Sequence, residues 1–346
     1  MKKVISTIIA SAVAVSSFGA WDLIDNFNSY SDGEIFTEAT EIGWNASTEA
    51  GTDEYWFLAD PYDPDNTALY VESGNYGVGN GNVWMVKELP GGGIAPGETG
   101  TIFFRNLWSG LGNNWHIGTA DKPLAFDEVT GNQTAPGAWG DYNALIRLGD
   151  AKNVEHRDGG GYVSTNPQVI VEVNIWYSFW MVVENTWDLT TTPPTSTGVH
   201  TLYMQGTGIG DVPTLIPVGT DPAKDAAFIR RAPTLDDEAG TPSNIIWCMF
   251  ASNSGSAATP NPGDPYLLDD IYFAKGMDLT DPLNPVEVTE WGGYPIANAA
   301  GDVDTGDWLG WINVSAAPYI FSYSLGWVYM EEPAADATGS WGYVYK

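Results

Sequence analysis

The chain contains little cysteine and little positive charge. Cys248 is the only cysteine among 346 residues, so no intrachain disulfide can form and the core must suffice without one. The 13 Lys and Arg residues face 44 Asp and Glu residues, which gives a formal net charge of −31. Nucleic acids and anionic membrane surfaces are bound through basic patches, so we expect neither as a partner.

Catalytic signatures are also absent. The sequence has no Gly-x-Ser-x-Gly motif, no zinc-ligand spacing and no phosphate-binding loop. Its three histidines, His116, His156 and His200, are scattered, and we interpret them as surface or capping residues. Cys248 lies in the apolar run Ile245–Phe250, which predicts a buried, inert thiol rather than a nucleophile.

Beyond the first residues, no apolar run is long enough to cross a bilayer as a helix. At the start, two lysines precede an apolar segment from Val4 to Val15, and small residues follow up to Ala20. This order is typical of a secretory signal peptide, which we assign to residues 1–20. The sequence therefore predicts a secreted protein, located outside the cell or on its surface.

Turn-forming and aromatic residues are abundant. The chain has 40 Gly and 22 Pro together with 16 Trp, 17 Tyr and 12 Phe, which predicts an all-β fold with many turns. Apolar runs and alternation predict strands at 55–59, 68–71, 83–88, 100–106, 143–148, 168–176, 178–184, 200–205, 244–250 and 267–274. One short helix is expected from Pro222 to about Arg231, because Asp221 can cap it and Pro222 suits its first position.

Two distant segments, 21–27 and 266–276, have the alternation of half-buried strands. If they pair, everything between them forms one β domain, which we place at residues 21–277. A linker at 278–290 follows, and the aromatic-rich residues 291–346 predict a small β-meander module of about three strands. Because such a sheet is marginally stable alone, we expect it to pack on the main domain or on a partner.

Three segments resemble bacterial secreted proteins with a concanavalin-like jelly-roll domain of the laminin-G or lectin type. They are Ile24–Phe27 with Tyr30–Gly33, Trp176–Asn185 and Leu268–Ala274, and the resemblance covers residues 21–277. The stretch from Gly306 to Tyr329 looks like an aromatic C-terminal module of marine surface proteins. The resemblance implies two stacked antiparallel sheets in a jelly-roll sandwich, often a structural calcium ion and frequently glycan binding, but not catalysis.

Sugar binding needs aromatic rings for the apolar faces of the sugar and polar groups for its hydroxyls. Alternation across 168–176 directs the valines to the core and leaves Glu172, Asn174 and Trp176 on the opposite face. Arg105 and Arg147 lie inside other predicted strands, and we expect both to point onto the same concave sheet. We therefore predict a carbohydrate-binding site of Arg105, Arg147, Glu172, Asn174 and Trp176, with a structural ion-pair layer as the alternative.

Acidic residues near the two terminal strands suggest a metal site. Calcium prefers several carboxylate and carbonyl oxygens, and Asp25 and Asp270 meet if those strands pair. We predict a structural calcium site at Asp25 and Asp270, with Asp269 pointing to the opposite face. Strand capping without metal is the alternative.

These patterns favour a secreted, non-catalytic protein that binds an extracellular polysaccharide. One alternative is a structural surface protein that assembles, or attaches to a cell-wall or surface component, through residues 291–346. The other is a divergent glycoside hydrolase or polysaccharide lyase. The Glu-x-Asp-x-Glu run common in concanavalin-like hydrolases is missing, which leaves Glu172 and Glu184 as the nearest carboxylate pair.

Overall fold

The computed structural model describes residues 21–36, 43–47, 54–72, 82–108, 113–121, 125–126, 133–135, 142–148, 153–159, 161–165, 168–219, 224–229, 241–254, 266–284, 290–291, 294–295, 302–305, 311–314, 319–322, 326–330 and 342–344. Residues 20–283 form one unit, the main unit, and residues 284–346 belong to a second, the C-terminal module. The predicted signal peptide lies outside the described residues. Within the described ranges, no helix has the length and apolar character needed to span a membrane.

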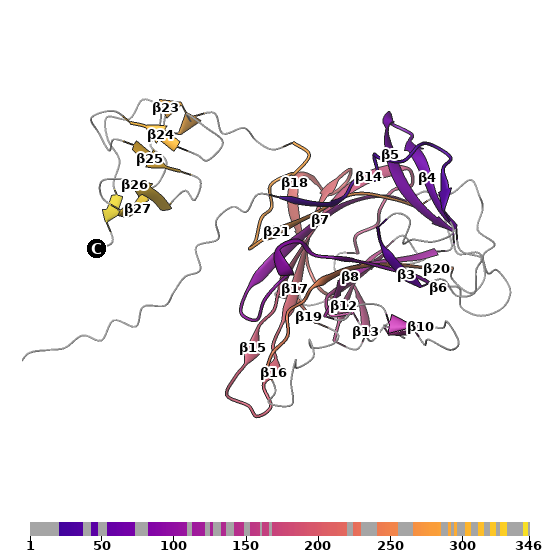
Figure 1. The fold of residues 1–346 in the computed structure, drawn as a ribbon, viewed down its shortest axis with the longest axis horizontal. Coiled ribbons are helices and arrows are strands. Elements are labelled where there is room, and N and C mark those ends of the chain that lie inside the picture. The colour runs from indigo at the N-terminus through magenta and orange to yellow at the C-terminus, as the bar shows by residue number, and fades with distance from the viewer. Residues whose placement is uncertain are drawn as a thin grey trace, which may run out of the picture. The chain divides into compact units, whose positions relative to one another are not determined.

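The main unit is built from two antiparallel sheets, the large sheet and the small sheet (Figure 1). The large sheet has the order β18-β17-β14-β7-β21-β5-β4-β2, with β1 paired to β21 and β19 paired to β17. Its strands are β1 (Asp22–Asp25), β2 (Ile35–Phe36), β4 (Glu54–Asp60), β5 (Asp63–Glu72), β7 (Thr99–Trp108), β14 (Ile175–Glu184), β17 (Val199–Gly206), β18 (Gly210–Ile216), β19 (Ala227–Phe228) and β21 (Tyr266–Lys275).

The small sheet has the order β13-β12-β11-β8-β20-β6-β3. Its strands are β3 (Asn45–Ser47), β6 (Asn82–Glu88), β8 (Asn113–Ala120), β11 (Leu145–Leu148), β12 (Val154–Asp158), β13 (Gly161–Ser164) and β20 (Trp247–Ser254). Two short ribbons, β9 (Ala125–Phe126) with β10 (Gln133–Ala135) and β15 (Trp187–Asp188) with β16 (Thr195–Ser196), and the 3₁₀ turn η2 (Pro90–Gly92) complete the unit. The structure confirms the predicted fold class, an all-β antiparallel jelly-roll sandwich.

The two terminal strands of the main unit pair as the sequence predicts. In β1, Asp22 lies opposite Phe273 of β21, and Asp25 lies opposite Ile271. Strand β21 also pairs with β7, so the last strand is hydrogen-bonded on both edges. Because the first and last strands meet inside one sheet, the intervening chain is closed into a single sandwich.

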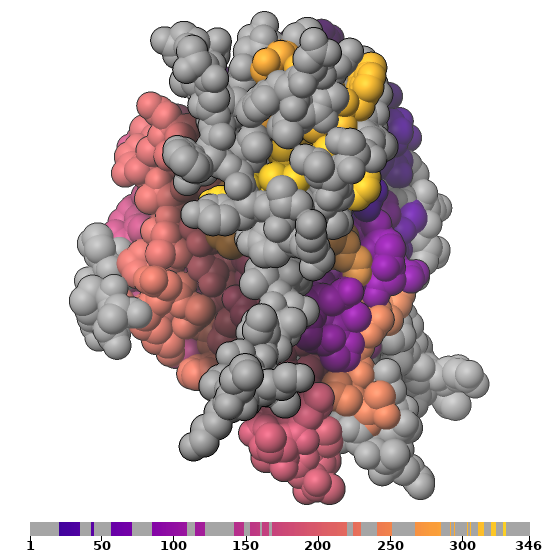
Figure 2. All heavy atoms as spheres, turned by 90° about the vertical axis from the view of Figure 1, so that its left-hand side faces the viewer, coloured from indigo at the N-terminus to yellow at the C-terminus, as the bar shows by residue number. Residues whose placement is uncertain are grey.

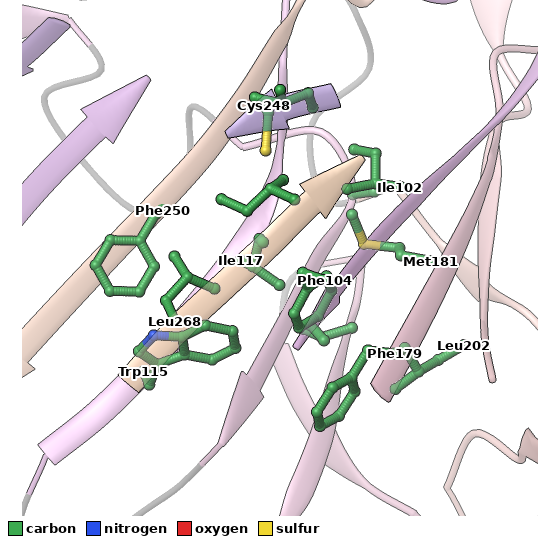
Figure 3. Close-up of a cluster of buried hydrophobic side chains, with 14 of the residues drawn as sticks. Ile102, Phe104, Trp115, Ile117, Phe179, Met181, Leu202, Cys248, Phe250 and Leu268 are labelled. Carbon is green, nitrogen blue, oxygen red and sulfur yellow. The ribbon is translucent and has the colours of Figure 1, made fainter. Parts of the chain in front are cut away.

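The core lies between the inner faces of the two sheets. Phe104 and Phe179 of the large sheet stack with ring centroids 4.9 Å apart, and Phe104 also contacts Trp115 of the small sheet. Figure 3 shows these rings together with Phe250 and Leu268, drawn from both sheets. All of these side chains are nearly or fully buried, which supplies the main hydrophobic stabilisation of the unit.

After β21 the chain turns back over the outer face of the large sheet. Thr101 Oγ1 donates a hydrogen bond to the Gly276 carbonyl at 2.7 Å and accepts one from the Asp278 amide at 3.0 Å. The Trp180 indole donates to the Thr280 carbonyl at 2.9 Å. Residues 278–283, which the sequence suggests as the start of a linker, are therefore held on the main unit.

The edge of the large sheet that ends in β17 and β18 forms part of the molecular surface. Figure 2 shows β17 and β18 in coral along this edge, with the rose hairpin β15–β16 at the lower end. Leu189, in the loop of that hairpin, is 70% exposed. This makes it a suitable control position for the variants proposed below.

Two local predictions are wrong. Residues 168–174 are not a strand: β14 begins at Ile175, after a turn in which Asn174 has a φ of 59°. The helix expected from Pro222 is also absent where the chain is described, because Ala227 and Phe228 pair with the edge of β17 as β19. At Ala227 and Phe228, tertiary pairing overrides a local helix signal.

The C-terminal module is a meander, with more strands than expected. Strands β24 (Asp302–Asp304), β25 (Trp311–Asn313), β26 (Tyr319–Ser322), β27 (Gly326–Met330) and β28 (Gly342–Val344) pair in chain order into a five-stranded antiparallel sheet, after the hairpin β22 (Glu290–Trp291) with β23 (Tyr294–Pro295). One face of this sheet buries Val303, Ile312, Ile320 and Val328 against Trp291. Strands of three residues show too little alternation to be recognised, so the sequence suggests only about three.

Candidate functional site

Arg105 lies near the middle of the large sheet, on its outer face. Successive side chains of β7 point to opposite faces, so Phe104 enters the core and Arg105 points out of it. Arg105 lies opposite Ser178 of β14 on one side and opposite Asp269 of β21 on the other. Only 20% of the Arg105 side chain is exposed, so its charge requires partners within the protein.

Two carboxylates and one indole hold the Arg105 guanidinium. Its Nη1 lies 3.0 Å from Asp270 Oδ2, and its Nη2 lies 3.6 Å from Asp60 Oδ2. The guanidinium carbon lies 4.5 Å from the centroid of the Trp176 ring, a cation–π contact. Because both carboxylates are buried, this network fixes the guanidinium and, through it, the Trp176 ring.

A β-bulge brings two carboxylates to this network. The register between β21 and β7 shifts between Asp269 and Tyr272, and Asp270 has a left-handed φ of 53°. Strict alternation would place Asp269 and Asp270 on opposite faces, as the sequence predicts, but the bulge interrupts the alternation at this point. Burial raises the pKa of Asp269 to about 8 and also raises that of Asp270, and the nearby charge of Arg105 offsets only part of this rise.

An exposed tyrosine stands beside this network. Tyr62, in the turn between β4 and β5, is 63% exposed, and its hydroxyl donates a hydrogen bond to the Asn174 carbonyl. Its backbone amide donates to Asp60 Oδ1 at 2.8 Å, so Asp60 joins the Tyr62 turn to Arg105. The Asn174 side chain is itself exposed. We call Tyr62, Arg105, Asn174 and Trp176 the Tyr62 face.

The structure thus brings together three of the five predicted carbohydrate-binding residues, Arg105, Asn174 and Trp176. Glu172 is exposed in the same turn, two residues before Asn174, and its amide donates a hydrogen bond to Tyr177 Oη at 3.0 Å. Sequence reasoning missed Tyr62, because the run of Asp-Pro residues around it is explained by turn formation alone.

Arg147 lies elsewhere, which corrects the expectation that it shares a face with Arg105. It belongs to β11 of the small sheet, where it lies opposite Glu155 and His116. Its Nε donates to Glu155 Oε2 at 2.5 Å, and its guanidinium lies 3.8 Å from the centroid of the Tyr162 ring. Both arginines point away from the core, but from different sheets.

The two predicted calcium ligands have different partners. Asp25 Oδ2 accepts hydrogen bonds from Lys87 Nζ at 2.7 Å and from the Trp44 indole at 2.8 Å, whereas Asp270 pairs with Arg105. An ion held by both carboxylates would have to displace two cationic side chains. The described residues contain no group of three or more His, Cys, Asp or Glu side chains arranged to hold a metal. The calcium site stays a prediction.

The histidines are buried, contrary to the expectation of surface or capping positions. His116 is 1% exposed, and His156 and His200 are fully buried. The rings of His156 on β12 and His200 on β17 stack with centroids 5.5 Å apart, so the pair joins the two sheets. Burial lowers the pKa of His156 to about 4 and that of His200 well below its usual value.

Strand β19 closes the edge beside this histidine pair. Its residue Ala227 lies opposite His200 of the large sheet. The Phe228 amide donates a hydrogen bond to Asp158 Oδ1 at 3.0 Å. The Phe228 carbonyl accepts one from the amide of Gly159, which directly follows β12. The Lys224 ammonium pairs with Asp158 as well. The two sheets are therefore tied together at this edge both by buried rings and by backbone hydrogen bonds.

The two glutamates considered for catalysis are far apart. Glu172 precedes β14 and Glu184 ends it, so the ten-residue strand separates them by roughly 30 Å. Glycoside hydrolysis requires two carboxylates about 5–10 Å apart. This pair therefore cannot act together on one glycosidic bond. Cys248 is fully buried as predicted, and burial raises the pKa of its thiol to about 12.

Comparisons with known proteins find similarity only among solved structures. No protein-family model matches the chain, and a search of curated proteins finds no match. The carbohydrate recognition domain of Emp47p is 11% identical over 74% of this chain and 95% of that one, with a TM-score of 0.36. Winged bean acidic lectin is 8% identical over 74% of this chain and 98% of that one, with a TM-score of 0.32. The PL-14 alginate lyase from Aplysia kurodai is 10% identical over 69% of this chain and 89% of that one, with a TM-score of 0.33. At these values the similarities place the chain in no family and carry no argument about its ligand.

Proposed function

We propose that the main unit binds an extracellular polysaccharide without cleaving it, and that the sugar contacts the Tyr62 face. The observation that carries this proposal is the position of Tyr62, an exposed aromatic ring whose hydroxyl is anchored on the backbone carbonyl of the exposed Asn174, two residues before the half-buried Trp176. Aromatic rings offer apolar faces to sugar C–H groups, and side-chain amides both donate and accept hydrogen bonds to hydroxyls.

The residues beneath this face hold it in place before a ligand arrives. Asp60 binds both the Tyr62 amide and the Arg105 guanidinium, and Arg105 in turn lies against Trp176. A site whose rings are already fixed loses less conformational entropy on binding. Arg105 acts as a positioning residue here, because its charge is already matched by Asp60 and Asp270.

The ion pairs of Arg105 with Asp60 and Asp270 also indicate which kind of sugar this face can bind. A free arginine would favour a carboxylated or sulfated sugar through bidentate hydrogen bonds. Arg105 is already paired, and two exposed acidic residues lie nearby in the chain: Glu172 in the turn before β14, and Asp63 at the start of β5. The chain as a whole is also strongly negative. These charges favour a neutral polysaccharide as the ligand.

Two expectations from the sequence accompany this proposal. The signal-peptide pattern of residues 1–20 supports secretion, and a secreted protein meets polysaccharides outside the cell. A structural calcium ion at Asp25 and Asp270 would stabilise the pairing of β1 with β21. We propose both.

The test is retention on a panel of neutral and anionic polysaccharides, combined with an assay for released products. We expect the wild type to be retained on at least one neutral polysaccharide and to release no product. Tyr62→Ala removes the exposed ring and should weaken binding by about thirtyfold, the effect of losing a binding hot spot worth about 2 kcal/mol. Tyr62→Phe keeps the ring and loses only the hydrogen bond to Asn174, so its loss should be smaller.

Leu189→Ala is the matched control, because it removes another exposed apolar side chain from a loop of the same unit. Undiminished retention of the Tyr62→Ala protein would refute the Tyr62 face as the binding site. Release of sugar fragments would instead support the hydrolase or lyase alternative. A protein retained on nothing would leave a structural role as the better interpretation.

A further inference from the structure

The stacked rings of His156 and His200 lie where one edge of the small sheet meets one edge of the large sheet. His156 belongs to β12 and His200 to β17, and strand β19 lies between these two strands (Figure 1). Both side chains are fully buried. We call the two rings together with β19 the histidine seam. Neither the core packing nor the Tyr62 face requires ionisable groups at this position, so their presence needs another explanation.

The surroundings of the two rings are apolar. In the strand ladders, the residues opposite them are Ile146 and Val163 beside His156, and Val183 and Ala227 beside His200. No ring nitrogen of the pair makes a hydrogen bond of normal geometry within the described residues. A protonated ring in such a place has lost its hydration without gaining a partner, which is costly.

The charged groups around the seam do not compensate for this cost. Burial has the largest effect, and it lowers the pKa of His156 to about 4 and that of His200 well below its usual value. The Ile216 backbone and the Asp158 carboxylate favour a charged His156, but the Lys224 ammonium, which pairs with the same carboxylate, opposes them. For His200, the neighbouring ring of His156 lowers the pKa further. Both rings are therefore neutral near pH 7.

Few backbone contacts hold the seam closed. Strand β19 has two residues, which pair with β17 on one side. On its other side, the Phe228 backbone is bonded to Asp158 and Gly159 at the end of β12. An isolated bridge between Thr165 and Val218 links the ends of β13 and β18. The sheet centres have long ladders instead, such as that of β7 with β14. A segment held this weakly can open while the rest of the unit stays folded.

We propose that the histidine seam is an acid-sensitive latch, in which protonation of His156 and His200 releases β19 and parts the two sheet edges while the sandwich centre stays folded. Two positive rings 5.5 Å apart in an apolar site repel each other strongly. Opening lets water reach both rings, so the open state binds protons more tightly than the closed state. Protons therefore shift the population toward the open state.

Linkage gives the size of this shift. At pH 5 a hydrated imidazole, with its ordinary pKa of about 6.5, is almost fully protonated. The closed His156, with a pKa of about 4, is still mostly neutral at that pH. The ratio of open to closed molecules should therefore rise about thirtyfold between pH 7.5 and pH 5 through His156 alone. His200 increases the ratio further, because its pKa is also lowered in the closed state.

Hydrogen exchange of the full chain, followed by mass spectrometry at pH 7.5 and pH 5, measures the opening. Rates are corrected for the intrinsic pH dependence of exchange. The amides of Phe228 and Ile229, which are bonded to Asp158 and to the Gly198 carbonyl, report on the seam. Peptides from β7 report on the sheet centre. We expect the seam amides to lose protection about thirtyfold or more, and the β7 amides to keep theirs.

Titration of Asp158 does not account for this result. Burial raises the pKa of this carboxyl, but its bonds to Lys224 and to the Phe228 amide outweigh burial and lower it. The carboxylate therefore keeps its charge at pH 5, and the Phe228 amide keeps its acceptor until the seam opens.

The matched variant carries His156→Phe and His200→Phe, which keeps two rings at the seam and removes the ionisable nitrogens. Its corrected seam exchange should be the same at both pH values. His116→Phe is the control, because it removes the remaining histidine, which is also buried, and should leave the acid response intact. In the wild type, NMR titration of the imidazole protons gives the two pKa values without any substitution.

Each outcome decides the proposal. Loss of protection confined to the seam, and absent from the double variant, would establish the latch. Equal loss in β7 would show that acid unfolds the whole unit, and unchanged seam protection at pH 5 would show that nothing opens; either result overturns the proposal. An acid response that persists in the double variant, or wild-type imidazoles that titrate near pH 6.5, would show that the buried rings do not control the seam. Sugar retention enters none of these measurements, so the latch is tested separately from the Tyr62 face.

Discussion

Arg105 and Asp270 form a 3.0 Å ion pair that depends on a β-bulge in the last strand of the main unit. Without the extra residue at this point, the Asp270 side chain would follow strict alternation into the core side of the sheet. The bulge turns it toward the outer face, where the guanidinium also contacts Asp60 and Trp176. One backbone irregularity thereby links three distant parts of the chain.

Arg105→Ala should destabilise the main unit strongly. It leaves Asp60 and Asp270 buried without a counter-ion, and breaking a buried pair in this way costs about 3–5 kcal/mol. Urea unfolding followed by tryptophan fluorescence measures the loss. Lys275→Ala is the control, because its pair with Glu98 is about half exposed and such pairs contribute about 1 kcal/mol or less. Equal effects of the two variants would contradict the buried network.

The buried histidine pair predicts a loss of stability in mild acid. The pKa of His156 is lowered to about 4 and that of His200 is also lowered, so the unfolded chain takes up protons first as the pH falls. The contribution of the neutral histidines to the free energy of unfolding is therefore fully present above about pH 6.5. It declines toward pH 4, by about 3 kcal/mol for His156 alone. Urea unfolding at a series of pH values gives the slope.

Carboxylates also titrate in this window, so a variant is needed to isolate the histidines. The double variant with His156→Phe and His200→Phe keeps aromatic rings between the sheets and removes the ionisable nitrogens. Its stability should depend less on pH between 6.5 and 4 than that of the wild type. Parallel pH profiles would show that the histidines do not carry the effect.

The calcium prediction is tested by thermal unfolding with calcium and with a chelator. An ion bound only by the folded state stabilises it by RT ln(1 + c/Kd), where c is the free ion concentration, so the melting temperature rises with the logarithm of the ion concentration above Kd. A lower melting temperature with chelator, absent in a variant carrying Asp25→Asn and Asp270→Asn, would support the site. Identical curves would mean that Lys87 and Arg105 are the only counter-ions these carboxylates need.

Cys248 should not react with thiol reagents in the folded protein. Its side chain is fully buried and burial raises the thiol pKa to about 12, so almost no thiolate forms near neutral pH. Iodoacetamide labelling followed by mass spectrometry should give modification in urea and almost none in buffer. Rapid labelling of the native protein would show that the small sheet opens easily around β20, which lies between β8 and β6.

The sequence by itself determines much of the architecture. Alternation within 21–27 and 266–276 predicts two half-buried strands, because apolar residues at every second position have one favourable place, on the inner face of a sheet. That these two strands pair with each other is a hypothesis from the sequence, and the structure confirms it. The apolar run around Cys248 predicts its burial for the same reason. These patterns are local, because an apolar strand face is buried whichever strands become its neighbours in the sheet.

Only the tertiary structure decides which polar residues meet. Arg105 and Arg147 have the same local pattern, yet they lie on different sheets, because strand order depends on pairings between distant segments. Tyr62 joins Asn174 through a turn that sequence reasoning treats as a simple connection. A bulge of one residue reverses the alternation at Asp270. Polar contacts of this kind are set by backbone geometry across the fold, and no periodicity along the chain encodes them.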